Sequence, residues 1–179
     1  VIWRTTNWGE PPVHIDNYLK AADLMKQCEG EGCNYDELLL SGLNAQILQS
    51  TKDKILVVLH TSTSHGPTYS KKYPPQFEVF SPVCNSVELA DCTNEALINA
   101  YDNTIVYTDY LVNRVIEDLK QLKEYKSTMI YVSDHGESLG EKNLYMHGVP
   151  MSIAPKEQYE IPFLVWTSEG SKQVKDTKI

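Results

Sequence analysis

Three short, mostly apolar runs along the chain predict strands that are covered on both faces. They span residues 55–60, 128–133 and 161–166. Pro162 stands near the start of the last run and favours an edge position, because proline cannot donate a hydrogen bond to a neighbouring strand. A further strand is indicated at residues 1–4, where the chain opens on Val, Ile and Trp.

One helical pattern lies between the strands expected at residues 1–4 and 55–60, and a second lies between those at residues 55–60 and 128–133. Residues 36–49 carry apolar side chains four positions apart, at Leu39, Leu43 and Ile47. A longer helix is predicted after Thr93, a suitable N-cap, with Glu95 in its first turn. The face expected to pack on the sheet is a mostly apolar stripe with gaps of three and four: Ile98, Tyr101, Ile105, Thr108, Val112, Val115, Leu119 and Leu122.

The alternation of strand and helix predicts an α/β fold. Strands that follow one another through a helix favour a parallel sheet with right-handed crossovers. In such sheets the chemistry lies beyond the carboxyl ends of the strands. The polar segments that follow residues 60 and 133 are therefore the candidate site.

Size and charge narrow the class of protein. The 179 residues suit one domain with one hydrophobic core. The net charge of -8 argues against a nucleic-acid partner, because phosphate contacts need a basic face. It also gives no overall attraction to an anionic membrane, although a local basic patch such as Lys71 and Lys72 could contact one.

Both ends of the chain suggest a piece of a longer protein. The first residues already read as a strand, and a mostly polar tail, residues 172–179, closes the sequence. No targeting segment precedes the first strand, and no apolar run is long enough to span a bilayer. The sequence ends therefore give no information on where the full protein resides.

The four cysteines form two local pairs. Cys28 and Cys33 flank a Glu-Gly-Glu-Gly loop, and Cys84 and Cys92 flank a polar loop. These spacings fit zinc knuckles poorly and favour two short disulfide loops, which are typical of an oxidising compartment. Four buried free thiols are the alternative.

The strongest chemical feature is Asp134 followed by His135 at the end of a predicted strand. Gly136 comes next and allows the backbone to turn, so that both side chains can converge on one cation. A carboxylate oxygen with an imidazole nitrogen suits zinc. The alternative is that Asp134 caps a turn and His135 is a surface residue.

Other polar residues are weaker candidates. His65 and His147 both precede glycine and could hold a phosphate, complete a second metal site or protonate a leaving group. Hydrogen bonding within loops would explain them equally well. Glu141 is interpreted as a solvated loop charge. Asp102 and Asp109 could support the site from behind its ligands, but a solvated helix edge is favoured. No Gly-x-Ser-x-Gly elbow surrounds the serines near these histidines, so a serine hydrolase has little support.

Several segments together carry a family resemblance. They are residues 133–141 (Ser-Asp-His-Gly-Glu-Ser-Leu-Gly-Glu) with His147-Gly148, and residues 59–60, 64–69, 73–74 and 99–103. Over nearly its whole length, the chain resembles the bacterial phosphoethanolamine transferases that modify lipid A, a family that includes enzymes of polymyxin resistance. The resemblance implies a three-layer α/β/α sandwich with a mainly parallel central sheet, as in the alkaline phosphatase and sulfatase superfamily.

The resemblance also implies roles for individual residues. Asp134 and His135 match two ligands of a catalytic Zn²⁺. His65 and His147 match histidines that bind the substrate phosphate or a second zinc. The cysteine pairs match disulfides of the family. The family's nucleophilic threonine and a glutamate ligand have no counterpart, so residues 1–179 are expected to be part of a single soluble catalytic domain whose nucleophile-bearing segment and membrane region lie elsewhere.

The activity implied is zinc-dependent transfer of phosphoethanolamine from phosphatidylethanolamine to lipid A or lipooligosaccharide. It would proceed through a covalent phosphothreonine at the periplasmic face of the inner membrane. One alternative is another phosphotransferase of the superfamily, such as a phosphoglycerol transferase, or a sulfatase. A non-catalytic metal-binding module is the other. The cysteine loops and His147-Gly148 favour the phosphoethanolamine branch, and an upstream threonine facing Asp134 would exclude the module.

Overall fold

The computed structural model describes residues 1–8, 11 and 13–169. It forms two compact units, Val1–Leu111 and Val112–Ile179, and each is described by itself. The polar tail, residues 172–179, lies outside the described residues.

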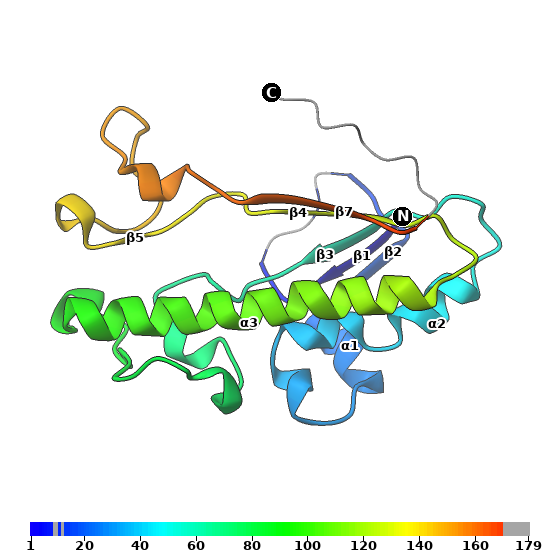
Figure 1. Ribbon diagram of the computed structural model, residues 1–179, viewed down its shortest axis with the longest axis horizontal. Coiled ribbons are helices and arrows are strands. Elements are labelled where there is room, and N and C mark those ends of the chain that lie inside the picture. Colours follow the sequence, from blue (N-terminus) through cyan, green and yellow to red (C-terminus); the bar gives the residue numbers. More distant parts are fainter. Residues whose placement is uncertain (9–10, 12, 170–179) are drawn as a thin grey trace. The chain divides into compact units, whose positions relative to one another are not determined.

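A parallel three-stranded sheet organises the first unit. Its strands are β1 (Ile2–Thr5), β2 (Asn17–Lys20) and β3 (Val57–His60), in the order β2-β1-β3 (Figure 1). Both pairings are parallel, and Thr5 lies opposite His60, so β1 and β3 end at the same edge. The strands expected at residues 1–4 and 55–60 are confirmed. Strand β2 was not predicted, because its two end residues are polar and exposed.

The single helix expected over residues 36–49 is wrong. The segment forms a 3-10 helix, Asp36–Leu40, and then a separate helix α2, Leu43–Leu48, which follows Gly42 with its positive φ of 64°. Arg4 explains the break. Its guanidinium is buried and donates to the carbonyl oxygens of Leu39 at 2.9 Å and Ser41 at 2.6 Å. A continuous helix would need these two carbonyls for its own hydrogen bonds.

Short helices fill the remainder of the first unit. Helix α1 spans Ala21–Leu24, and its Leu24 packs in a small core with Leu38 and Leu39. The 3-10 helices are Met25–Gln27, Glu31–Asn34, Tyr69–Lys71, Pro75–Phe77 and Leu89–Asp91. Disulfides Cys28–Cys33 and Cys84–Cys92 close two of the loops, with Cα–Cα distances of 5.8 and 5.7 Å. Both predicted cysteine pairings are confirmed.

The long helix α3 spans Asn94–Gln121. Its expected N-cap is confirmed, because the hydroxyl of Thr93 accepts a hydrogen bond from the backbone N–H of Ala96 at 3.2 Å. The expected apolar stripe is wrong in the first half of the helix, where Ile98 and Ile105 are 43% and 44% exposed. The buried face consists of Ala96, Leu97, Ala100, Asn103, Thr104, Tyr107 and Leu111.

A polar and aromatic contact explains why that face is buried. The side chain of Asn103 accepts hydrogen bonds from the backbone N–H groups of Val79 and Phe80, both at 2.9 Å. The ring of Tyr107 lies 4.9 Å from that of Phe77. The loop around residues 77–80 therefore packs on a helix face that hydrophobicity alone does not indicate.

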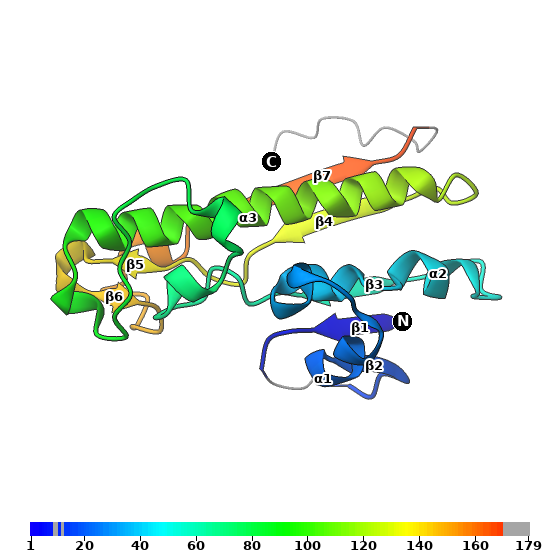
Figure 2. The same ribbon diagram turned by 90° about the horizontal axis from the view of Figure 1, so that it is seen from below.

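The second unit contains two antiparallel pairs of strands. Strand β4 (Thr128–Val132) pairs with β7 (Phe163–Thr167), and the short β5 (Ser138–Leu139) pairs with β6 (Tyr145–Met146) (Figure 2). Two 3-10 helices, Glu141–Asn143 and Lys156–Gln158, lie between them. The strands predicted at residues 128–133 and 161–166 are confirmed in position. Their expected cover on both faces is wrong, because Ile130, Val132 and Phe163 are 59%, 51% and 63% exposed. Strand β7 runs antiparallel to β4, a direction that the helix-crossover rule did not address, because no long helix was expected between them. In the described part of the chain, no helix combines the length and apolar character needed to cross a bilayer.

Candidate metal and phosphate site

The Asp134-His135 turn directly follows strand β4. The backbone N–H of His135 donates to Asp134 Oδ1 at 3.1 Å, and His135 Nδ1 donates to the carbonyl oxygen of Gly136 at 3.0 Å. A neutral ring with its proton on Nδ1 presents the lone pair of Nε2. His135 Nε2 lies 3.9 Å from Asp134 Oδ1, so the two ligand atoms lie on the same side of the turn.

This donor pair fits a zinc ion. Zinc binds histidine nitrogen and carboxylate oxygen at about 2.0–2.2 Å, so two atoms 3.9 Å apart can reach one ion. The side chain of Asp134 is 81% exposed and that of His135 is 30% exposed, so a further ligand has access. The contact from His135 Nδ1 to a backbone carbonyl fixes the ring, as is usual for metal-binding histidines.

Gly136 is required by a close backbone approach. A Cβ atom at this position would lie 2.0 Å from the carbonyl oxygen of Glu157. The backbone N–H of Gly136 donates to the carbonyl oxygen of Gln158 at 3.0 Å, and the Gln158 side chain donates to Ser138 Oγ at 2.8 Å. These contacts attach the Asp-His turn to the 3-10 helix at residues 156–158.

His147 lies beside the same turn. The β5–β6 pair places Met146 opposite Ser138, and this pairing returns the chain to the segment after His135. The rings of His135 and His147 stack with their centroids 3.7 Å apart and an interplanar angle of 27°. His147 Nδ1 donates to Glu137 Oε1 at 3.2 Å, and the side chain of Glu137 is only 3% exposed. The second unit thus brings together Asp134, His135, Glu137 and His147.

Two acidic residues differ from what the sequence indicated. Nothing in the sequence distinguished the buried Glu137 from the other acidic residues near the turn, because its burial depends on the β5–β6 pairing. Glu141 was interpreted as a solvated charge, but its Oε2 accepts a hydrogen bond from the backbone N–H of Leu139 at 2.6 Å. Glu141 therefore fixes the β5–β6 connection.

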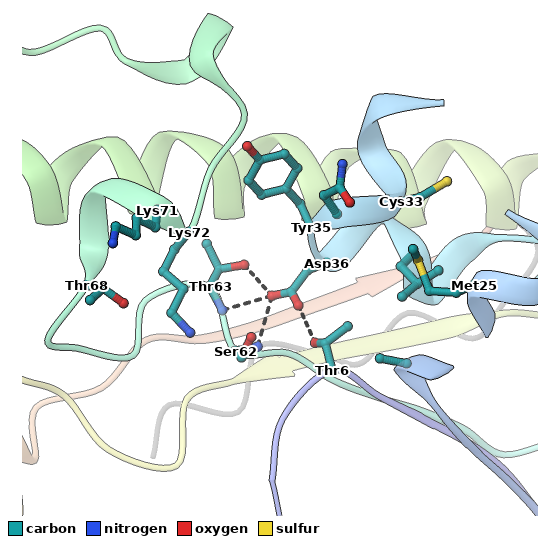
Figure 3. A pocket seen from close by; sticks show the side chains of 13 residues that line it. Thr6, Met25, Cys33, Tyr35, Asp36, Ser62, Thr63, Thr68, Lys71 and Lys72 are labelled. Carbon is teal, nitrogen blue, oxygen red and sulfur yellow. Dashed lines mark hydrogen bonds between the residues drawn. The ribbon is translucent and has the colours of Figure 1, made fainter. Parts of the chain in front are cut away.

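His65 belongs to the first unit and follows strand β3. Its Nδ1 donates to the carbonyl oxygen of Gly66 at 2.8 Å. The preceding residues are held by the buried carboxylate of Asp36, which accepts hydrogen bonds from the backbone N–H groups of Ser62 at 2.9 Å and Thr63 at 2.8 Å (Figure 3). The hydroxyl groups of Thr63 and Thr6 also donate to Asp36. Sequence reasoning missed Asp36, which has no neighbouring chemical motif.

The serines near the histidines have structural contacts. Ser64 Oγ accepts a hydrogen bond from the hydroxyl of Thr104 at 2.9 Å, and Ser133 Oγ donates to the carbonyl oxygen of His135. Ser138 is fully buried and receives the bond from Gln158. None of these hydrogen bonds joins a serine hydroxyl to a histidine ring, which agrees with the absence of a nucleophile elbow.

Comparison with known proteins defines the family. The model of the sulfatase family matches residues 5–179, and the chain belongs to this family. It is 48% identical over 177 residues to the phosphoethanolamine transferase EptA of Helicobacter pylori, covering 97% of this chain and 33% of that protein. The chain thus spans about a third of the length of this relative.

Solved structures agree with the sequence comparison. The C-terminal periplasmic domain of phosphoethanolamine transferase EptC from Campylobacter jejuni matches with a TM-score of 0.82 and 41% identity, over 94% of this chain and 52% of that one. The soluble domain of lipooligosaccharide phosphoethanolamine transferase A from Neisseria meningitidis matches with a TM-score of 0.78 and 34% identity, over 94% and 51%. The chain therefore has the expected fold class, an alkaline phosphatase/sulfatase-like α/β sandwich.

Proposed function

We propose that this chain is part of the catalytic domain of a phosphoethanolamine transferase. The donor would be phosphatidylethanolamine and the acceptor a lipid A phosphate or another surface glycan such as lipooligosaccharide. The observation that carries the proposal is the Asp134-His135 turn, in a chain 48% identical to a phosphoethanolamine transferase over 177 residues. The similarity to a lipooligosaccharide phosphoethanolamine transferase supports the acceptor class.

Asp134 and His135 would hold the zinc ion of this enzyme. When bound, the ion would lower the pKa of a coordinated hydroxyl and stabilise negative charge on the phosphoryl group. The remaining ligands and the nucleophilic threonine are assigned to a segment outside residues 1–179, since no position here matches them. The proposal treats residues 1–179 and that segment as one catalytic domain.

His147 would contact the substrate phosphate or protonate the leaving oxygen. The buried carboxylate of Glu137 accepts a hydrogen bond from Nδ1, which orients the ring and assigns the substrate contact to Nε2. His65 would have a similar role, with its Nδ1 held by the carbonyl oxygen of Gly66. Binding of a second zinc ion by these histidines is the alternative role within the same proposal.

We place the protein at the periplasmic face of the bacterial inner membrane, attached through a region outside this chain. The likeness to a periplasmic domain supports this location. The two disulfides also suit an oxidising compartment.

The test is transfer by the purified full-length protein. Phosphatidylethanolamine and lipid A are incubated with the protein, and mass spectrometry detects phosphoethanolamine on lipid A. Asp134→Asn is expected to abolish transfer, and the exposed Asp53→Asn is the matched control that retains it. Cleavage of an aryl sulfate without phosphoethanolamine transfer would instead identify a sulfatase. Transfer that survives Asp134→Asn would contradict the metal assignment.

A further inference from the structure

A cavity of about 500 Å³ lies in the first unit, beside the segment that follows β3. Figure 3 shows Thr68, Lys71 and Lys72 on one side of it and Tyr35 and Asp36 on the other. This volume is within the range of about 300–1,000 Å³ that is typical of small-molecule sites. All of its lining residues belong to the first unit.

The cavity carries a local positive charge in a chain whose net charge is -8. Within the described ranges, the ammonium groups of Lys71 and Lys72 have no ion-pair partner. Asp36 also lines the cavity, but it is 3% exposed and accepts the four hydrogen bonds already described. These hydrogen-bond donors stabilise the single negative charge of Asp36, and the two ammonium groups give the cavity lining an excess of positive charge.

The remaining lining suits a polar ligand that is larger than an anion alone. Thr68 and Ser62 carry hydroxyl groups, and the aromatic residue Tyr35 also lines the cavity. Hydroxyl groups beside an aromatic ring can hydrogen-bond and stack with a sugar, whereas a free phosphate would leave most of the volume unused.

We propose that this cavity binds a phosphorylated sugar, with Lys71 and Lys72 contacting its phosphate group. The cavity would thus hold the acceptor's sugar phosphate, an assignment that rests on the proposed function; the binding itself does not depend on transfer. Salt is expected to weaken the contact between the lysines and the phosphate group, because dissolved ions screen the charges of partly exposed side chains.

Isothermal titration of the full-length protein with glucose 1-phosphate, in a chelator that removes bound metal, tests the inference. Lys71→Gln with Lys72→Gln is expected to weaken binding about tenfold, the equivalent of 1.4 kcal/mol. Lys52→Gln with Lys54→Gln, two exposed lysines of the same unit outside the cavity lining, is the matched control and keeps the wild-type affinity. Lys71→Arg with Lys72→Arg retains the charge and is expected to bind within about threefold of wild type.

The arms of the experiment distinguish the ligand class. Glucose tests whether the phosphate group is needed. Glycerol 3-phosphate represents a phospholipid headgroup, and inorganic phosphate represents the anion alone. All three probes are expected to bind more weakly than glucose 1-phosphate. An unchanged affinity in the double glutamine variant, or equal binding of any of these probes, would overturn the proposal. If lysine-dependent binding is found in a protein that transfers no phosphoethanolamine, the proposed function fails and the sugar-phosphate site remains.

Discussion

The backbone N–H of Thr63 donates a 2.8 Å hydrogen bond to the buried carboxylate of Asp36, and the Thr63 side chain donates to the same oxygen. The two residues are 27 positions apart, and the carboxylate also holds Ser62 and Thr6. One buried acidic side chain thus anchors the segment between β3 and His65. A buried carboxylate is tolerated because hydrogen-bond donors surround it.

Replacing this carboxylate is expected to destabilise the first unit. Asp36→Asn keeps one oxygen for the backbone N–H groups of Ser62 and Thr63, but its amide N–H₂ group then faces the hydroxyl of Thr6, and the charge that strengthens all four hydrogen bonds is lost. The expected loss in the free energy of unfolding is about 2–3 kcal/mol. Urea denaturation followed by circular dichroism measures it. Asp53→Asn, at an exposed position, is expected to change stability by less than about 0.5 kcal/mol, and an equal loss in both variants would contradict the anchor role.

Asn103 has a comparable role on helix α3. It is fully buried, accepts from the backbone N–H groups of Val79 and Phe80, and donates to the hydroxyl of Tyr73 at 3.2 Å. Asn103→Ala leaves these groups without partners and is expected to cost about 3 kcal/mol or more. Asn113→Ala, at an exposed position of the same helix, should be nearly neutral. Thermal denaturation of the two variants compares them directly, and equal melting temperatures would refute the assignment.

Gly136 supports a prediction about the Asp-His turn. Gly136→Ala would place a methyl group 2.0 Å from the carbonyl oxygen of Glu157, so the backbone of one segment has to move. We expect a loss of stability of about 3 kcal/mol and weaker zinc binding, measured by denaturation and by metal titration. Gly32→Ala is the control, because the atoms nearest to its methyl group, at 3.1–3.3 Å, belong to the side chain of Glu37 and not to the backbone. Wild-type metal affinity in Gly136→Ala would show that the turn tolerates the shift.

The sequence predicted best the features that depend on local pattern. The apolar runs gave the positions of β3, β4 and β7, and Thr93 gave the start of α3. The proximity of Asp134 and His135 follows from a strand end next to glycine. Local pattern also indicated both cysteine pairs.

The failures share a physical cause, which is contact between segments far apart in the chain. Arg4 interrupts the helix expected at residues 36–49 by taking two of its carbonyl groups, 35 and 37 positions away. Asn103 shifts the buried face in the first half of α3 away from the expected stripe, because it binds the loop at residues 79–80. The burial of Asp36 and Glu137 likewise depends on partners that hydrophobic periodicity does not reveal.

The two disulfides are expected to contribute modestly and independently. The linked cysteines are 5 and 8 positions apart, and closing such short loops contributes roughly 2–3 kcal/mol each through the entropy of the unfolded chain. Replacing Cys84 and Cys92 together by serine should lower the free energy of unfolding by this amount and leave the Cys28–Cys33 bridge intact. Peptide mapping without reduction checks the pairing. Recovery of free Cys28 or Cys33 thiols from the variant would contradict independent loops.

Asp102 predicts how stability depends on pH. Burial on helix α3 raises the pKa of its carboxyl above the ordinary value of 3.8, and burial is the only cause of the shift. Between pH 3.8 and the raised value, the folded state binds more protons than the unfolded state, so this residue makes stability decrease as the pH rises through that window.

Asp102→Asn removes the cost of a half-buried charge. The variant should therefore gain stability relative to the wild type at neutral pH, and the gain should disappear as the pH falls below 3.8. Asp109→Asn, exposed on the same helix, is the matched control and should show no such pH-dependent gain. Urea denaturation of the three proteins across the acidic range measures the difference, and a gain that persists at the lowest pH would show that burial of the charge is not its origin.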